Sequence, residues 1–399
     1  MATKPSPISV QLRAKGKQYW IRLLLFVIVG ALLGEWIGEK NLWIVLRYRL
    51  YQYFQQMLPR EAYAKDTVVI LVGDEEYWRG EPAGRVPIKR GYLAKLVEAL
   101  NEFDPAVIAL DFDLRSEPSD AGEYAVETET LAKAVKIAAQ QRPVVLPKTI
   151  WLDETKQYFL EPDVVDRFDL GPVHRGYIAL PFEQLQIALA IPLKGGGSID
   201  SLAEAIVRAR NERALQSLPA RSKILFAGYL PVAAFPRIPA GQILSANAST
   251  YKPQIAHQVV IVGAAWHTLG FDRGSIVDTY DTPAGKMGGV FIHANYVEAL
   301  LDRRVYRPIA KPLAVGVEAV LLAALAILFA VKVSRTLKLL LLIVCVGFVV
   351  SISFLAFTAF GVFYDFFTPL FSVIAHYLYE IVKGWRKDAL LYRQQQGVP

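Results

Sequence analysis

The sequence is poor in the residues that build disulfides and metal centres. Its 399 residues include one cysteine and five histidines. The single thiol, Cys345, excludes an intrachain disulfide, and the absence of His-x-x-x-His and Glu-x-x-His spacings argues against zinc. No Walker loop, Gly-x-Ser-x-Gly elbow or Gly-x-Gly-x-x-Gly turn is present. We therefore predict no enzyme activity, no cofactor and no metal.

Acidic charge is also in the minority, with 37 acidic against 44 basic residues and a formal net charge of +7. Hydrophobic residues make up 53% of the chain, which is high for a water-soluble protein. Much of the basic excess flanks apolar segments, where it meets anionic lipid headgroups. The charge therefore indicates contact with membrane lipids, and we predict no nucleic-acid partner.

Long apolar runs predict four transmembrane helices, because about twenty apolar residues span the ~30 Å hydrocarbon core. For the first run a cleaved signal peptide is the alternative, since signal peptides and membrane anchors both have an apolar core that follows basic residues. The run continues through Ile37 with no small-x-small cleavage site after it, which favours an uncleaved anchor. The predicted helices cover residues 20–38, 312–331, 339–362 and 366–382.

The charged residues between these runs predict the topology. Lys332, Arg335 and Lys338 separate two of the runs, and positive loops face the cytoplasm. Residues 1–19 and 383–399 are then cytoplasmic, and residues 39–311 face outwards. We expect a multi-pass protein of the bacterial inner (plasma) membrane whose large domain lies in the periplasm or outside. Glu318, His376 and Glu380 lie in the runs and are expected to pair between helices or with a partner subunit.

The outward-facing segment is predicted to be an α/β domain with a mostly parallel sheet. Thr67–Gly73 and Ala106–Phe112 are continuous apolar runs typical of strands buried on both faces, and a helical pattern from about Tyr92 separates them. Strand, helix and strand in this order form a βαβ unit. Further strands are predicted at 143–147, 223–228 and 258–263, and helices at 41–58, 129–140, 183–190, 199–215 and 289–304.

Acidic residues follow the first two predicted strands. Asp74 and Glu75 follow the first strand, and Asp111 and Asp113 end the second, so we expect both pairs at the carboxyl edge of neighbouring strands. Open α/β sheets bind ligands at this edge, and carboxylates suit a cation or polar ligand. In the alternative, which we favour, the acids cap helices and pair with Arg85 and Arg90.

A catalytic role is not expected for Asp111-Phe112-Asp113, although the spacing is like that of an aspartyl phosphatase. Arg115 occupies the place of the usual hydroxyl residue, and no lysine and acidic metal partner follow. His293 and Asn295, at a predicted helix start, are a candidate site, although a satisfied buried histidine is the simpler interpretation.

Taken in order, several motifs over residues 60–305 resemble the type-two CHASE family, the cyclase and histidine-kinase associated sensory extracellular domains. The motifs are VVILVGDEEYW, GRVPIKR and VIALDFDLRSEPSD, followed by VVIVGAAWHTLGFD, DTPAGKMGG and GVFIHAN. The resemblance implies a sensory domain with one helix before it and three after it. Ligand-binding candidates are Asp74, Glu75, Arg90, Asp111, Asp113, Asp281, His293 and Asn295.

The chain departs from that family after the last apolar run. About a dozen residues follow Trp385, too few for the kinase or cyclase that the resemblance implies, and the segment 168–181 diverges. We therefore expect a non-enzymatic sensor that binds a ligand or partner and signals through other proteins, as a homo-oligomer or hetero-complex. A scaffold subunit of a membrane-associated complex is the alternative, and an outward-facing metal-dependent hydrolase is a third class.

Overall fold

The computed structural model describes residues 21, 41–58, 63–115, 122–180, 186–216, 218, 224–330 and 335–364. The chain divides into two compact units, which we describe separately. One comprises residues 55–307, and the other comprises residues 1–54 together with 308–399.

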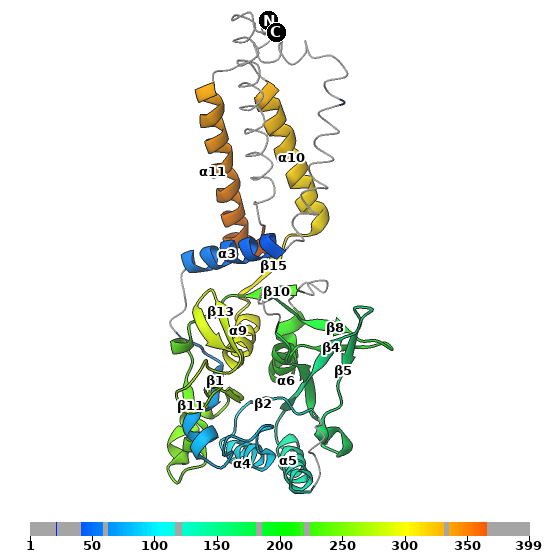
Figure 1. Cartoon of the computed structure of the whole chain (residues 1–399), viewed down its shortest axis with the longest axis vertical. Helices are drawn as coiled ribbons and strands as arrows, with labels where there is room; N and C mark the ends of the chain where they lie inside the picture. Colours follow the sequence, from blue (N-terminus) through cyan, green and yellow to red (C-terminus); the bar gives the residue numbers. More distant parts are fainter. Residues whose placement is uncertain are drawn as a thin grey trace, which may run out of the picture. The chain divides into compact units, whose positions relative to one another are not determined.

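A six-stranded sheet forms the centre of the unit 55–307, with the order β11–β1–β12–β2–β3–β6 (Figure 1). Every pair of neighbours in this sheet runs parallel. Both faces of the sheet are covered, which explains why its inner strands are continuous apolar runs. The strands are β1 (Thr67–Val72), β2 (Val107–Asp111), β3 (Val144–Lys148), β6 (His174–Tyr177), β11 (Arg237–Pro239) and β12 (Val259–Ala264).

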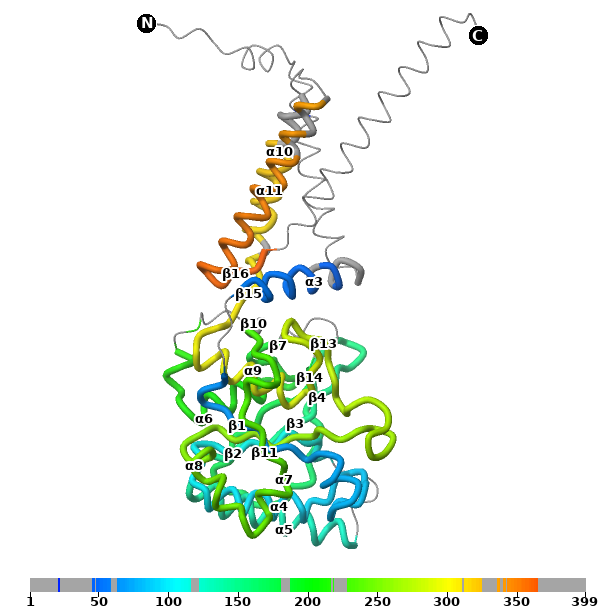
Figure 2. The backbone as a smooth tube through the Cα atoms, turned by 90° about the vertical axis from the view of Figure 1, so that its left-hand side faces the viewer, coloured from blue at the N-terminus to red at the C-terminus, as the bar shows by residue number. Residues whose placement is uncertain are grey.

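Helices cover the two faces of this sheet. On one face lie α4 (Arg90–Asn101) and α5 (Glu123–Ala139), and on the other lie α6 (Leu202–Gln216) and α9 (Gly289–Leu301) (Figures 1 and 2). In α4 the buried side chains recur at helical spacing and join the core formed with β1, β2 and β12. Each fully buried Leu or Val contributes about 1.5–3 kcal/mol. Helix α9 is buried on all sides from residue 289 to residue 300.

Shorter elements surround the sheet. Hairpins pair β4 (Ile150–Leu152) with β5 (Tyr158–Leu160), β8 (Ala190–Pro192) with β9 (Ser198–Asp200), and β13 (Thr279–Thr282) with β14 (Gly285–Gly288). Strand β10 (Ile224–Ala227) lies between β7 (Gln186–Ala188) and β15 (Val305–Pro308). Short helices are η1 (Glu75–Arg79), η2 (Val164–Arg167), η3 (Val232–Ala234), α7 (Ala240–Ile243), η4 (Ala248–Tyr251) and α8 (Lys252–Ile255).

The structure confirms the α/β class and most of the predicted elements. The helix predicted at 183–190 is wrong, because residues 186–188 form strand β7. Leu185, Ile187 and Leu189 alternate with polar or small residues, and that period of two fits a strand. The last predicted helix ends at Leu301, and the chain then enters β15.

The predicted neighbourhood of the first two strands is also wrong. Strand β12 lies between β1 and β2, and its Ile261 faces both Val69 and Ala109. The connection from β1 through α4 to β2 therefore skips one strand position in the sheet. A strand from much later in the chain fills that position, so the strand order depends on a long-range pairing.

The second unit contains α3 (Asn41–Met57), α10 (Lys311–Ala330), α11 (Arg335–Phe360) and β16 (Val362–Phe363). An aromatic cluster joins α3 to the end of α11. The ring of Phe54 lies 5.3 Å from that of Phe354, and the ring of Tyr51 lies 6.0 Å from that of Phe357 and 5.6 Å from that of Phe363. Within this unit, the cluster fixes the end of α3 against the end of α11.

Within the part of the chain that the structure describes, one helix is long and apolar enough to cross a membrane, at Ile343–Phe360 in α11. Helix α10 coincides with the predicted segment 312–331, and its shorter apolar stretch covers Pro312–Ala324. The predicted segments 366–382 and 20–38, apart from Ile21, lie outside the described residues, as do His376 and Glu380. The prediction of four membrane helices is therefore not confirmed.

Candidate functional site

The carboxyl ends of β1, β12 and β2 form the candidate site. Three segments begin there: η1 after β1, the long segment between β12 and α9, and the residues after β2. Ligands of open α/β sheets bind at this edge. The segment between β12 and α9 contributes most of the groups described below.

An aromatic stack ties these three segments together. The rings of Tyr77 and Trp266 lie 3.9 Å apart with an interplanar angle of 7°, and Phe112 lies 6.4 Å beyond Trp266 at 11°. The indole nitrogen of Trp78 also donates a 3.1 Å hydrogen bond to the carbonyl oxygen of His267. The segment after β12 is therefore held between the segments that follow β1 and β2.

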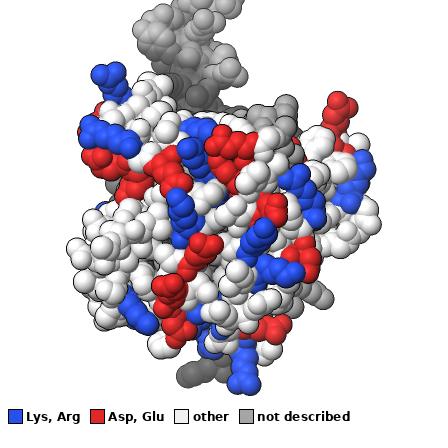
Figure 3. All heavy atoms as spheres, turned by 90° about the horizontal axis from the view of Figure 1, so that it is seen from below, with Lys and Arg blue, Asp and Glu red and all other residues white. Residues whose placement is uncertain are grey.

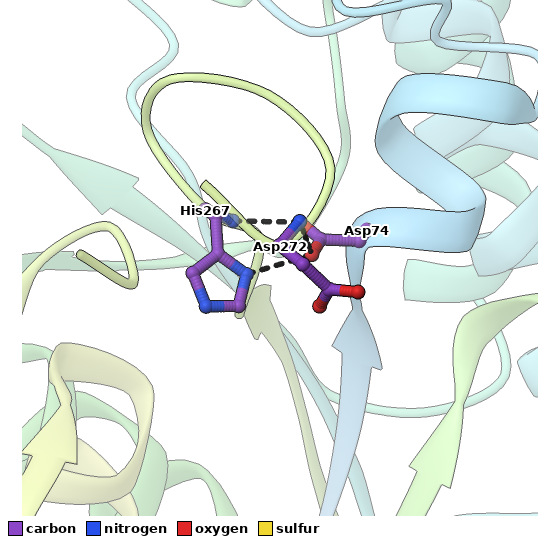
Figure 4. A group of neighbouring side chains, drawn as sticks. All are labelled: Asp74, His267 and Asp272. Atoms are coloured by element: carbon purple, nitrogen blue, oxygen red, sulfur yellow. Dashed lines mark hydrogen bonds and ion pairs between the residues drawn. The ribbon is translucent and has the colours of Figure 1, made fainter. Parts of the chain in front are cut away.

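Asp74 organises the turn after Trp266 (Figure 4). Its Oδ1 accepts a 2.7 Å hydrogen bond from the backbone N–H of His267, and its Oδ2 accepts one of 2.9 Å from that of Asp272. The Nδ1 atom of His267 lies 2.7 Å from the same Oδ2. Burial opposes ionisation of Asp74, but these hydrogen bonds and the nearby imidazole together keep its pKa below the usual value.

Asp74, His267 and Asp272 have a donor set that a metal ion could use, with ligand atoms within 4.8 Å of one another. Both oxygens of Asp74 already accept hydrogen bonds from the turn, so a cation would have to displace them. Asp272 contributes its backbone N–H to this arrangement. The geometry is that of a side chain that fixes a turn.

A second group of titratable side chains lies where β2 meets α9. Asp111 is the last residue of β2, and His293 is in the early part of α9. Their Oδ1 and Nε2 atoms are 3.8 Å apart, and their side chains are 10% and 1% exposed. The Nδ1 atom of His293 has no hydrogen-bond partner among the described residues. The structure thus brings these two predicted site residues together.

Asp278 and Tyr280 extend this group towards the surface. The Tyr280 hydroxyl donates a 2.7 Å hydrogen bond to Oδ1 of Asp278, and the Asp278 carbonyl accepts one of 2.8 Å from the N–H of Gly289. Asp278 has a φ of 53°, in the left-handed region. We refer to Asp111, Asp278, Tyr280 and His293 as the β2–α9 cluster.

Glycines allow α9 to approach this cluster closely. A Cβ atom at Gly289 would lie 1.8 Å from Oδ2 of Asp278, and one at Gly263 would lie 2.4 Å from Cγ2 of Val290. Real Cβ atoms do not approach other atoms so closely. The first turn of α9 therefore lies directly on the end of β12 and against the Asp278 carboxylate.

Burial controls the ionisation of the β2–α9 cluster. It raises the pKa of Asp111 to about 7 and lowers that of His293 to about 4. Desolvation raises the pKa of Asp278, although part of its side chain is exposed. The hydrogen bond from Tyr280 opposes this shift, and the charge of Asp111 adds to it. At neutral pH the imidazole is therefore uncharged and does not offset the charge of the two carboxylates.

A half-open pocket of about 370 Å³ adjoins this cluster. It is formed by the segment between β12 and α9, including the β13–β14 hairpin. Its lining residues bring hydroxyl groups, two carboxylates and one amine to the wall, alongside apolar surface. The lining residues are Thr268, Ser275, Ile276, Asp278, Thr279, Tyr280, Asp281 and Lys286.

Of the predicted site residues, Asp281 lines this pocket, and Asp111 and His293 belong to the adjoining cluster. The others have separate surroundings. Glu75 is exposed and pairs with Arg79 at 2.8 Å, and Asp113 pairs with Arg115. Asn295 is buried and exchanges hydrogen bonds with the backbone N–H and carbonyl of Leu230. These three residues have structural partners rather than a shared site.

The predicted pairing of the edge acids with Arg85 and Arg90 is wrong. Arg85 pairs with Glu127, and Arg90 is buried between α4 and α5, where it donates a 3.0 Å hydrogen bond to Oγ1 of Thr128. The expected capping role is also wrong for Asp74, which precedes η1 but makes no side-chain cap hydrogen bond to it. Glu76 accepts hydrogen bonds from the N–H groups of Gly73, before η1, and of Gly241, in the first turn of α7.

Sequence reasoning missed Asp278, Tyr280, His267 and Trp266. All of them lie in the long segment between β12 and α9. Long connections inside compact domains are uncommon and often functional, so length was the available signal. The partners of these side chains depend on the position of β12, which the sequence pattern did not reveal.

Comparison with known families gives one match. A family model described as the CHASE2 domain matches residues 23–331, and this confirms the resemblance seen in the motifs. No curated protein and no solved structure matches the chain.

Proposed function

Because the chain belongs to the CHASE2 domain family, whose members are extracellular sensory domains, we propose that residues 55–307 bind a ligand at the carboxyl edge of the sheet and relay its binding to the membrane helices. The relay is a non-enzymatic signal, received by partner proteins. The observation that carries this proposal is the position of α9, which connects the β2–α9 cluster with both ends of the domain.

The entry of the chain into the domain is held by α9. Glu298 is fully buried, and its carboxylate accepts hydrogen bonds of 3.2 Å and 2.9 Å from the backbone N–H groups of Lys65 and Asp66. These residues directly precede β1. The segment that follows α3 is therefore attached to the same helix whose first turns carry His293.

The exit of the chain from the domain is attached to α9 as well. The helix ends at Leu301, and the chain continues through β15 into α10. The N–H of Gly228 donates a 2.9 Å hydrogen bond to the Arg304 carbonyl, which keeps this exit against β10. A displacement at the start of α9 would thus reach both connections, because a helix buried on all sides moves as one body.

Hydrogen exchange of the full chain in nanodiscs tests this relay. The variant Asp111→Asn alters the β2–α9 cluster at the start of α9, and we expect changed exchange at residues 65–67 and 302–308, at the far end. The matched control Asp113→Asn alters an exposed acid outside the cluster and should leave both segments unchanged. If the changes with Asp111→Asn stay within the cluster, the relay is wrong.

We propose that the chain is held in the bacterial inner membrane by the four predicted helices, with its domain outside and both termini in the cytoplasm. The apolar run in α11 and the family match support the anchoring and the outer position. On the face drawn in Figure 3, basic and acidic side chains are interspersed, which supports our proposal that nucleic acid is not a partner.

The partners in this proposal are membrane lipids and a second copy or another membrane or extracytoplasmic protein. Gentle purification from native membranes with native mass spectrometry separates the sensor from the scaffold alternative. Stoichiometric companion subunits and no ligand-dependent exchange would favour the scaffold. A homo-oligomer that carries a small molecule would favour the sensor.

A further inference from the structure

The pocket beside the β2–α9 cluster has the composition of a small-molecule site. Its volume of about 370 Å³ is at the small end of the range of ~300–1,000 Å³ that is typical of such sites. Thr268, Ser275, Thr279 and Tyr280 bring hydroxyl groups to its wall, and Ile276 brings an apolar side chain. This wall suits a polar ligand of about the size of an amino acid.

The Asp278 carboxylate gives part of this pocket a negative charge. The Asp278 carboxylate lines the wall and accepts a hydrogen bond from the Tyr280 hydroxyl, which orients it. Asp111 lies behind Asp278 and is close enough for its charge to raise the Asp278 pKa. His293, the basic side chain of the cluster, is neutral at pH 7 because it is buried. A cationic group at the exposed Asp278 carboxylate would therefore relieve its repulsion with the buried Asp111 carboxylate.

The opposite charge is available elsewhere on the wall. Lys286 on β14 stands directly across from Asp281 on β13 in the hairpin register, and both residues line the pocket. An amine together with several hydroxyl groups can accommodate the polar or anionic end of a ligand. The wall thus offers an amine as well as carboxylates.

We propose that this pocket binds a small amine-bearing molecule of about amino-acid size, with its ammonium group on Asp278. The inference rests on the sensory function proposed above and specifies the ligand class. An ammonium ion is favoured over a bare metal ion, because the wall offers hydroxyl groups and a lysine around the carboxylates instead of a shell of carboxylate oxygens.

Binding of a cation next to Asp111 has a consequence for pH dependence. The cation favours the ionised form of Asp111, whose pKa in the domain is about 7. Protons are then released on binding, so affinity should rise as the pH increases from 6 to 8. A neutral or anionic ligand would show no such rise.

The test is titration calorimetry of the full chain in nanodiscs, with alanine and ethanolamine as amine probes. Lactate and ethylene glycol are the matched controls, since each replaces the ammonium group by a hydroxyl. We expect binding of at least one amine and at least tenfold weaker binding of its control. Asp278→Asn should weaken the amine at least tenfold, whereas Asp113→Asn, outside the pocket, should leave it unchanged.

If Asp278→Asn fails to fold, Tyr280→Phe, which removes the hydroxyl that orients the Asp278 carboxylate, provides the second variant, with an expected loss of several-fold. Equal binding of amine and control, or no binding of either amine, overturns the ligand class. Failure of the sensory function is distinguishable from this result. If only the sensory function fails, an amine binds and its affinity depends on Asp278, but the hydrogen exchange of residues 65–67 does not change when it binds.

Discussion

The Nε2 atom of His293 lies 3.8 Å from Oδ1 of Asp111, at the point where α9 meets the end of β2. In water an aspartate and a histidine would form an ion pair between about pH 4 and 6.5. Burial reverses their order here, with pKa values of about 7 for Asp111 and about 4 for His293. Both side chains are therefore mainly neutral in that range of pH.

Asp111→Asn should change how stability depends on pH. Because the folded-state pKa of Asp111 is raised from 3.8 to about 7, the folded protein holds a proton that the unfolded chain releases. Wild-type stability is therefore lost as the pH rises from about 4 to 7, and the variant lacks this loss. The difference in unfolding free energy should grow over this range, by at most ~4 kcal/mol. Melting curves at several pH values measure it, and parallel curves for the two proteins would contradict it.

His293→Gln should act in the opposite direction. The folded-state pKa of His293 is lowered from 6.5 to about 4, so the unfolded chain binds a proton that the folded protein does not. The unfolding free energy of the wild type therefore falls by at most ~3 kcal/mol as the pH drops from 6.5 towards 4, and the variant lacks this decrease. The same melting series measures it. His257→Gln, which removes an exposed imidazole far from the β2–α9 cluster in the sequence, is the control substitution in this series.

Gly289→Ala should destabilise the domain by about 1–3 kcal/mol, because its Cβ would lie 1.8 Å from the Asp278 carboxylate. Gly91→Ala is the matched control. It also lies in the first turn of a helix, and its nearest new contact is 3.6 Å away, an ordinary distance. Denaturation midpoints of the two variants compare them directly, and equal midpoints would show that the Asp278 side chain can rotate away from α9.

Glu298→Ala should cost about 2–4 kcal/mol, since it leaves the backbone N–H groups of Lys65 and Asp66 without their carboxylate partner. Faster hydrogen exchange of these two amides is the specific readout. Glu129→Ala removes an exposed glutamate on α5 that pairs with Lys133, and should leave both stability and the exchange of residues 65 and 66 unchanged. Unchanged exchange at residues 65 and 66 would show that Glu298 does not hold the entry of the chain.

Asp74→Ala should loosen the turn from His267 to Asp272, whose N–H groups it binds. We expect faster exchange of these amides and a loss of about 1–3 kcal/mol. Addition of calcium to the wild type should leave the melting temperature unchanged, since both oxygens of Asp74 are engaged by the turn. A calcium-dependent rise in melting temperature that Asp74→Ala abolishes would instead identify a metal site.

The sequence predicted the α/β class, most elements and the family, because each rests on local patterns. The apolar run Thr67–Val72 reflects a strand that is buried on both faces. The helical spacing in α4 reflects a helix that packs one face against the sheet. Strand β7 was misassigned because its run is short, and short apolar runs fit a helix or a strand almost equally well.

The candidate site was predicted only in part. Asp111 and His293 could be identified as polar residues at the ends of predicted elements, and Asp281 through the family motif DTPAGKMGG. Their partners Asp278 and Tyr280 could not, since they lie at the start of the short hairpin strand β13, which no apolar period marks.

The sequence by itself determined which segments form strands and helices, because the period of the apolar residues records which faces are buried. Only the tertiary structure decided that β12 enters between β1 and β2, and that Asp278 thereby comes to lie beside Asp111. The reason is physical: strand order and side-chain proximity depend on pairings between residues distant in the chain, and several apolar β-branched strands would fit the same gap.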